Sequence, residues 1–185
     1  MTDYPLRGGV CVNGLPVAGV YHAGRRVGLT HDDTLLVPSG KNFMRYGAYA
    51  DDNCSAAIRP DGGLDIVLKS TFKAWYAITW ATQLADVGLA AGDIITASCD
   101  NLPPNVFMST RFQEGGKLLS ETQHLNSGLS TVSSAIPTGT TQIISQLFTS
   151  ADHTEDRSLT IYPQIERGSQ RTCWEPPENL RGGAR

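Results

Sequence analysis

The sequence predicts an all-β protein, and three observations support this. The chain has 185 residues, which is the size of one domain. It contains 19 Gly and 10 Pro, residues that favour tight turns. From about residue 40 to Trp174, short segments alternate apolar and polar residues and are separated by turn residues. Period-two patterning at this spacing is typical of a β-sandwich or a β-barrel.

The first predicted element is a small β-ribbon within residues 1–38. A type I′ hairpin turn is indicated at positions 13–14, and a second turn at Ala23-Gly24. A ribbon of this size cannot bury its apolar face alone, so we expect it to dock on another surface. That surface is the rest of the chain, a sister subunit or a larger assembly. The residues expected to form the ribbon are Asn13, Gly14, Val17, Val20 and Tyr21.

The main body is expected at residues 39–177, followed by a mobile polar tail at 178–185. A short helical turn is predicted at 82–93, where Leu84, Val87 and Leu89 would cap the sandwich. Pro163 lies inside the last strand, so we expect a position where its missing N–H is not needed, such as an edge or a bulge. The predicted strands are 64–70, 74–81, 93–100, 106–113, 141–150 and 158–165.

Two of these strands show which side chains should face the core. In 106–113, Val106, Met108 and Phe112 share one face, opposite Ser109 and Arg111. In 158–165, Leu159 and Ile161 oppose Thr160 and Tyr162. The apolar set of each strand is expected to be buried.

Composition excludes several classes of function. The net charge of −3 and the absence of a basic stripe argue against nucleic-acid binding. No segment approaches the roughly 20 apolar residues of a membrane helix, and the N-terminus has no signal-peptide pattern. The four cysteines show no CxxC spacing, so we expect free thiols rather than a zinc site.

The motifs of catalysis are also missing. There is no phosphate-binding loop, no HExxH and no GxSxG, so we expect neither an enzyme nor a cofactor. Acidic residues stand beside histidines at 31–33 and 153–156, and Asp51, Asp52 and Asp61 suggest a structural calcium site. Such polar loops are more often simply solvated, and no metal is expected.

Aromatic residues are the best candidates for recognition. If residues 72–80 form a strand, Trp75 and Trp80 lie on opposite faces, and Tyr76 shares a face with Trp80. Both Trp residues would be buried in two packed layers, or one would be exposed. An exposed Trp would contact a glycan or another subunit.

The C-terminal part carries a resemblance to a known group. The segment "QIERGSQRTCWEP" resembles the C-terminal signature of bacteriophage structural proteins, whose domains are jelly-roll sandwiches similar to carbohydrate-binding modules. A second match lies in "LAAGDIITASCD", which keeps Leu89, Gly92, Thr96 and Ser98. The N-terminal ribbon is similar to that of minor tail proteins of actinobacterial phages. The residues that carry the C-terminal motif are Gln164, Ile165, Glu166, Gly168, Ser169, Thr172, Trp174 and Pro176.

This resemblance implies a jelly-roll fold and a non-enzymatic phage virion protein located in the virion. One alternative is a minor tail or tail-tip component, whose outward domain contacts a host cell-wall glycan. Another is a capsid decoration protein bound to the major capsid protein, with the chain itself a homotrimer. A remote alternative is a free carbohydrate-binding module.

The motif also has a physical interpretation. Gln164 and Glu166 would hydrogen-bond to the backbone of the following turn, and Gly168 would allow a sharp exit from the strand. Trp174 would then pack over the end of the sandwich. Such an arrangement would hold the C-terminus against the fold.

Overall fold

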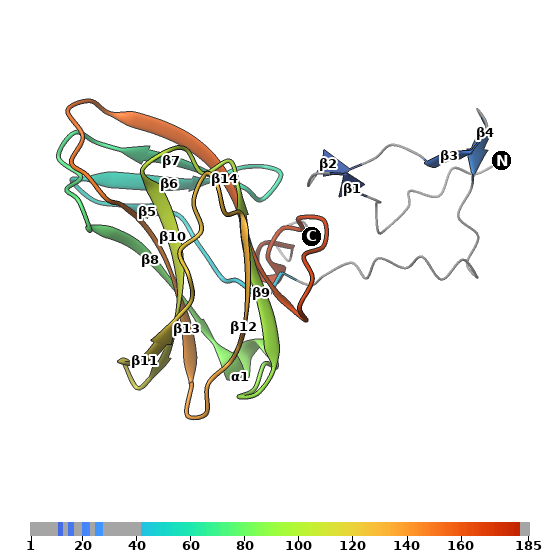
Figure 1. Ribbon diagram of the computed structural model, residues 1–185. Helices are drawn as coiled ribbons and strands as arrows, with labels where there is room; N and C mark the ends of the chain where they lie inside the picture. The colour runs from blue at the N-terminus through green and yellow to red at the C-terminus, as the bar shows by residue number, and fades with distance from the viewer. Residues whose placement is uncertain (1–10, 13–14, 17–19, 23–24, 28–41, 182–185) are drawn as a thin grey trace.

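The structure is a computed structural model that describes residues 11–12, 15–16, 20–22, 25–27 and 42–181. Residues 42–181 form two antiparallel sheets packed face to face (Figure 1). The predicted all-β sandwich is therefore confirmed. The six-stranded sheet has the order β12 (Thr131–Ala135), β9 (Ile94–Asp100), β14 (Arg157–Arg167), β7 (Leu64–Leu68), β6 (Cys54–Ile58) and β5 (Tyr49–Ala50). The four-stranded sheet has the order β11 (Lys117–Glu121), β10 (Val106–Glu114), β13 (Gln142–Thr149) and β8 (Ala77–Gln83).

The connections between strands define the topology. From β7 to β14 the chain changes sheet at every connection except the hairpin between β10 and β11. Every strand pair is antiparallel. Eight strands crossing between two sheets in this order form a jelly roll, with β5 and β6 extending one edge.

Most elements lie where the patterns predict them, but four strands were missed. Strands β7, β8, β9, β10, β13 and β14 coincide with predicted segments, although β8 begins only at Ala77. The helical turn is α1 (Leu84–Val87), and Leu84, Val87 and Leu89 are buried. The missed strands β5, β6, β11 and β12 are short, and β11 and β12 are largely solvent-facing, so their hydrophobic alternation is weak.

The core lies between the sheets and contains the residues that the alternation indicates. Val106, Met108 and Phe112 of β10 are at most 3% exposed and face Ile161 and its neighbours from the opposite sheet. Phe72, in the loop before β8, is fully buried at one end of this core.

Pro163 lies in a central strand rather than at a sheet edge, but at a position where its missing N–H is not needed, as expected. The pairing of β14 with β7 ends at Ile161, and Pro163 lies just beyond it. On that side the Pro163 carbonyl accepts hydrogen bonds from Asn42 Nδ2 at 3.1 Å and Trp174 Nε1 at 3.2 Å. Because the nitrogen and carbonyl of a strand residue point the same way, the missing N–H faces this gap and costs no ladder bond.

The two ends of the chain differ in what is described. β1 (Cys11–Val12) pairs with β2 (Leu15–Pro16), and β3 (Val20–His22) pairs with β4 (Arg25–Val27). Val20 and Tyr21 lie in β3, whereas Asn13, Gly14 and Val17 lie outside the described residues. The expected mobile tail begins with α2 (Glu178–Arg181), where Asn179 donates to the Tyr46 carbonyl at 3.0 Å. In the described part of the chain, no helix has the length and hydrophobicity needed to cross a membrane.

Candidate functional site

The structure separates the three aromatic candidates. Trp75 is 67% exposed, whereas Trp80 is buried in the core and donates its indole N–H to the Gly47 carbonyl at 3.3 Å. Trp75 and Tyr76 precede β8 rather than lying in it, so the expected strand over 74–76 is wrong. The interpretation that both Trp residues are buried is also wrong. Trp80 cannot reach a ligand, and Trp75 can.

Trp75 is held in an unusual backbone conformation. Its φ is +66°, in the left-handed region that costs a non-glycine residue about 1 kcal/mol or more. The Trp75 N–H donates to the Thr149 carbonyl at 2.9 Å, and the Ala74 N–H donates to Asp152 Oδ1 at 2.8 Å. These two bonds fix the loop on the end of β13. The indole is therefore exposed and preorganised.

The loop is also held from its other side. The Tyr76 hydroxyl donates to Asp51 Oδ2 at 2.6 Å, and its ring packs edge-on against Phe72 at 5.3 Å. The hydrogen bond from Tyr76, followed by that from Tyr49, lowers the pKa of Asp51 far below its ordinary value. Neighbouring residues Trp75 and Tyr76 thus have different roles, one exposed and one anchoring.

Trp75 begins a row of stacked rings on the outer face of the four-stranded sheet. Its ring centroid lies 5.6 Å from that of Phe148, with 27° between the planes. Phe148 in turn stacks on Phe107 at 5.7 Å and 19°, and these two residues are directly paired between β10 and β13. His124 meets the Phe148 ring edge-on at 5.0 Å. We call Trp75, Phe148 and Phe107 the aromatic row.

Polar side chains share the outer face with the aromatic row. Gln146 donates to Thr79 at 3.4 Å across β13 and β8. Glu121 lies 3.3 Å from Arg111 and 3.1 Å from His124. A chain of amide hydrogen bonds of 2.9 Å runs across three strands through Gln83, Gln142 and Gln113. The face therefore combines flat apolar rings with amide, guanidinium and carboxylate groups.

Sequence reasoning missed Phe107, Phe148 and His124. A signal was present, because Phe107 and Phe148 occupy outward positions of strands whose other alternate residues form the core. A large apolar side chain on the polar face of a strand indicates either a covered surface or a binding surface.

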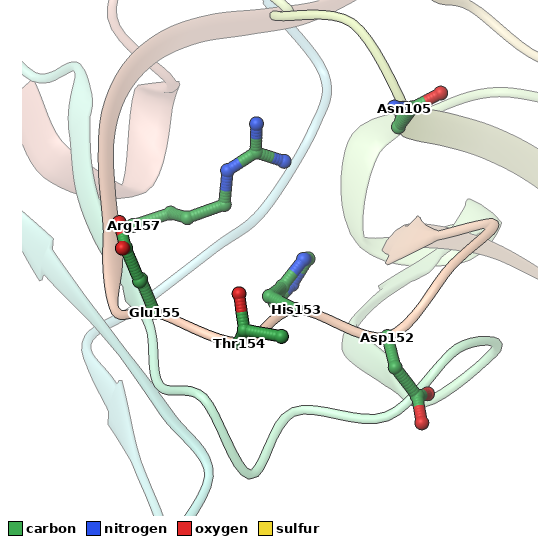
Figure 2. Close-up of a pocket in the computed structure, with 6 residues that line it drawn as sticks. All are labelled: Asn105, Asp152, His153, Thr154, Glu155 and Arg157. Atoms are coloured by element: carbon green, nitrogen blue, oxygen red, sulfur yellow. The ribbon is translucent and has the colours of Figure 1, made fainter.

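A polar pocket of about 340 Å³ opens at the end of the sandwich that carries the Trp75 loop (Figure 2). In Figure 2, His153 and Thr154 rise from its floor, Arg157 extends over it, and Asn105 lies on the far side. The Asp152 carboxylate, which also belongs to its lining, is turned away toward the Trp75 loop. The lining comes from Asn105, directly before β10, and from residues 152–155 and Arg157 around the start of β14.

His153 links this pocket to the core. Its ring stacks on Phe72, with centroids 6.0 Å apart and 13° between the planes. Burial, reinforced by the positive charge of Arg157, lowers the pKa of His153 below its ordinary value of 6.5. The shift favours the neutral form of the ring.

The acidic residues considered as metal ligands are engaged in other interactions in the structure. Asp51 is engaged by two tyrosine hydroxyls and by the Asn53 and Cys54 amides, while Asp61 interacts with Arg59 and Tyr162. Asp156 accepts from the Ser70 N–H at 2.8 Å. Within the described part of the chain, no three His, Cys, Asp or Glu residues gather as metal ligands would. Residues 31–33 lie outside it.

The C-terminal motif covers the outer face of the six-stranded sheet. We call residues 168–176 the C-terminal strap. It leaves β14 at Gly168, whose φ is +109°, and the fully buried Glu166 accepts hydrogen bonds from the Thr172 N–H and hydroxyl. Gln164 is 1% exposed and accepts from the Glu175 N–H at 2.8 Å.

The other residues of the motif complete this closure. Trp174 packs edge-on against Tyr162 at 5.0 Å, and the Ser169 carbonyl accepts from Ser133 at 3.3 Å. A Cβ on Gly62 would lie 2.5 Å from Pro176, which shows how closely the strap approaches the sheet. The arrangement of the motif holds the strap in place.

The cysteines differ from the expectation at one position. Cys54 and Cys99 are free and buried, and burial raises the pKa of the Cys54 thiol to about 12. Cys173, in the strap, is disulfide-bonded. The expectation of free thiols is therefore wrong for Cys173.

Comparisons with known proteins identify only distant structures. No protein-family model and no curated protein matches the chain. The crystal structure of accessory secretory protein 1, 2 and 3 of Streptococcus pneumoniae is similar, with 14% identity and a TM-score of 0.49, over 71% of this chain and 96% of the matched one. The Glycosylation Associate Protein (Gap123) complex of Streptococcus agalactiae matches with 12% identity and a TM-score of 0.45, over 68% of this chain and 44% of the matched one.

These structures correct the expectation of a phage protein. Both come from bacteria, both include several proteins, and neither is a phage component. The phage resemblance is therefore wrong, and so are the tail and capsid roles, the phage partners and the virion location that followed from it. The physical reason lies in the motif, whose residues hold the C-terminal strap on a β-sandwich and do not specify a function.

Proposed function

We propose that this chain is a non-catalytic binding module and that Trp75, the exposed end of the aromatic row, contacts the ligand, while Phe148, only 6% exposed, supports the indole by stacking. The observation that carries the proposal is the exposed Trp75 ring, held at positive φ and stacked on Phe148. A backbone strain of about 1 kcal/mol is kept where the surrounding structure enforces it, and such strain clusters at ligand contacts. Exposure of a single apolar side chain is common on protein surfaces, so the exposure of Trp75 alone would not indicate a site. Its constrained backbone is the additional observation.

The ligand we propose is a carbohydrate. A sugar ring offers one apolar C–H face, which fits the flat surface of the indole, and hydroxyl groups around its rim. Those hydroxyls need both donors and acceptors, and Gln146, Arg111 and Glu121 supply them on the same face. A purely apolar partner would leave these polar groups unpaired, at a cost in affinity.

A non-catalytic role agrees with the chemistry of this face. Arg111 is paired with Glu121, which also lies beside His124. Apart from these pairs, the outer face offers amides and hydroxyls, which bind and orient but do not transfer protons at neutral pH.

The test is a binding measurement with a set of immobilised glycans, followed by titration calorimetry with soluble oligosaccharides. We expect Trp75→Ala to weaken binding at least tenfold, because removal of a central aromatic contact costs about 2 kcal/mol. Leu118→Ala is the matched control, since Leu118 is also an exposed apolar residue, at 44%, but lies on β11 outside the row.

Two results would reject the proposal. One is the absence of binding to any glycan by the wild-type chain. The other is equal loss of binding in Trp75→Ala and Leu118→Ala, since that would show a general effect of surface hydrophobicity.

A second candidate function concerns the N-terminal strand pairs. β1–β2 and β3–β4 are two-stranded pairs of two or three residues per strand, and such pairs are at best marginally stable alone. We propose that residues 1–38 contact a protein partner, either another copy in a homotrimer or a different protein. Sedimentation of the full chain and of a variant lacking residues 1–36 tests this, and an unchanged mass would reject self-association.

A further inference from the structure

We infer that the polar pocket is a second subsite for the same ligand and that it takes a neutral, hydroxyl-rich group. This inference rests on the proposed function of the aromatic row. If the pocket is such a subsite, its residues select the length and the charge of the ligand.

The pocket and the aromatic row occupy the same end of the sandwich. Asn105 lines the pocket and lies directly before β10, two residues ahead of Phe107 of the row. The backbones of Asn105 and Ser150 are hydrogen-bonded, and Ser150 follows the Thr149 carbonyl that holds Trp75. A ligand that lies on the row therefore reaches the mouth of the pocket without crossing the sheet.

Asp152 connects the Trp75 loop to the loop that lines the pocket. Its carboxylate accepts from the Ala74 N–H at 2.8 Å and lies 3.5 Å from the Lys73 ammonium, so it fixes the loop that carries Trp75. His153, Thr154 and Glu155, which follow directly, line the pocket. One short loop thus positions both contact surfaces.

Asp152 apart, three polar side chains of the pocket lining are exposed to solvent and are not engaged by the protein. Within the part of the chain that the structure describes, the side chains of Thr154, Glu155 and Arg157 make no hydrogen bond or ion pair. His153 Nε2 is buried and also has no partner there. A buried ring nitrogen without a partner costs free energy unless a ligand or water satisfies it.

The charges of the lining decide which ligand fits. The Asp152 carboxylate is turned away and lies beside the Lys73 ammonium, so the charged groups left to the pocket are the Glu155 carboxylate and the Arg157 guanidinium. One carboxylate and one guanidinium leave the lining without net charge, so an anionic ligand gains no net attraction and would bring its charge beside Glu155. A hydroxyl group donates to Glu155 and accepts from Arg157 at once, so a neutral polyol satisfies both.

Titration calorimetry with the full-length chain tests this. The probes are glucose-based and N-acetylglucosamine-based oligosaccharides of one to six rings, and an oligomer of uronic acids as the anionic comparison. We expect affinity to rise with length and the uronic acid oligomer to bind more weakly. Glu155→Gln and Arg157→Gln should lose about fivefold in affinity for the longest neutral ligand and nothing for the single ring.

The controls separate this inference from the proposed function. Glu114→Gln is the matched substitution, since Glu114 is an exposed carboxylate at the opposite end of β10. If Glu155→Gln and Arg157→Gln bind all lengths as the wild type does, the second subsite is rejected while the dependence on Trp75 stands. Tighter binding of the uronic acid oligomer would reject the neutral ligand class. If the wild-type chain binds no member of the series, the proposed function fails and the subsite with it.

Discussion

The outer faces of the two sheets differ in how much of each is covered by other segments of the chain. On the six-stranded sheet, the polar residues Thr96, Ser98, Gln164 and Glu166 are at most 3% exposed because the C-terminal strap lies over them. Figure 1 shows this part of the chain, in red, beside β9 and β14. On the four-stranded sheet, no described segment covers Trp75, which stays 67% exposed.

The difference separates a face that the chain covers with its own C-terminal strap from a face on which Trp75 stays exposed, and the second is the face for which we propose a ligand. On the covered face, buried polar groups are paired with the strap, as buried groups must be. On the open face, the backbone of Trp75 has a positive φ and its ring is exposed to solvent. Trp174 on the covered face packs against Tyr162 and is half-buried, whereas Trp75 stacks on Phe148 and still leaves 67% of its surface exposed.

The largest effect on the covered face is expected from Glu166→Ala. The substitution leaves the Thr172 N–H and hydroxyl without the acceptor that the fully buried carboxylate provides. Hydrogen bonds to a charged group contribute about 1.5–3 kcal/mol, so we expect the free energy of unfolding to fall by about 3 kcal/mol in urea denaturation. Glu114→Ala, at an exposed carboxylate, should change it by less than about 0.5 kcal/mol. Equal stability of the two variants would contradict the role of the strap.

On the open face, Trp75→Gly and Trp75→Ala separate stability from binding. Both remove the indole and should weaken glycan binding to the same extent, at least tenfold. Glycine adopts a φ of +66° without strain, so Trp75→Gly should be about 1 kcal/mol more stable than Trp75→Ala. Thermal unfolding measures this difference. If Trp75→Ala is as stable as Trp75→Gly, the backbone at this position is not strained.

Asp51→Asn tests how the Trp75 loop is anchored, through its pH dependence. Hydrogen bonds from Tyr76 and Tyr49 lower the folded-state pKa of Asp51 below its ordinary value of 3.8. A lowered carboxyl pKa contributes stability above the unfolded-state value, and this is lost as pH falls from there through the folded-state value. The wild type should therefore be more stable than Asp51→Asn at pH 7, and the gap should shrink below about pH 4. Melting temperatures between pH 2 and 7 provide the measurement, and a constant gap would contradict the anchor.

The smallest effect is expected from Gln146→Ala, on the open face between the strands. Gln146 makes one 3.4 Å hydrogen bond to Thr79, so stability should change by less than about 0.5 kcal/mol. If Gln146 contacts a sugar hydroxyl, glycan affinity should fall about two- to fivefold, equivalent to one neutral hydrogen bond. Unchanged affinity would place the ligand away from the centre of the sheet and nearer the end that holds the pocket.

Much of the fold could be predicted because alternation is a local property. Val106, Met108 and Phe112 alternate with polar residues along one strand, and the sheet buries them as that pattern requires. Strands β5 and β12 escaped prediction because they are short and only half-buried, so their pairing partners decide them.

The candidate site was only half predictable for a related reason. Trp75 could be singled out as an aromatic residue, but its exposure depends on the loop that places it before β8 and on Asp152, 77 positions away in the chain. The aromatic row itself pairs Phe107 with Phe148 across two strands. Contacts between residues so distant in sequence leave no local pattern.

The sequence by itself determined the class of fold, the main strands and the faces that they bury, because these follow from the residues within each segment. Tertiary structure alone decided which outer face would be closed and which would stay open. The same residue type, tryptophan, is core at Trp80, part of the strap at Trp174 and exposed at Trp75. The physical reason is that burial depends on which distant segments lie over a side chain, and only the folded chain brings those segments together.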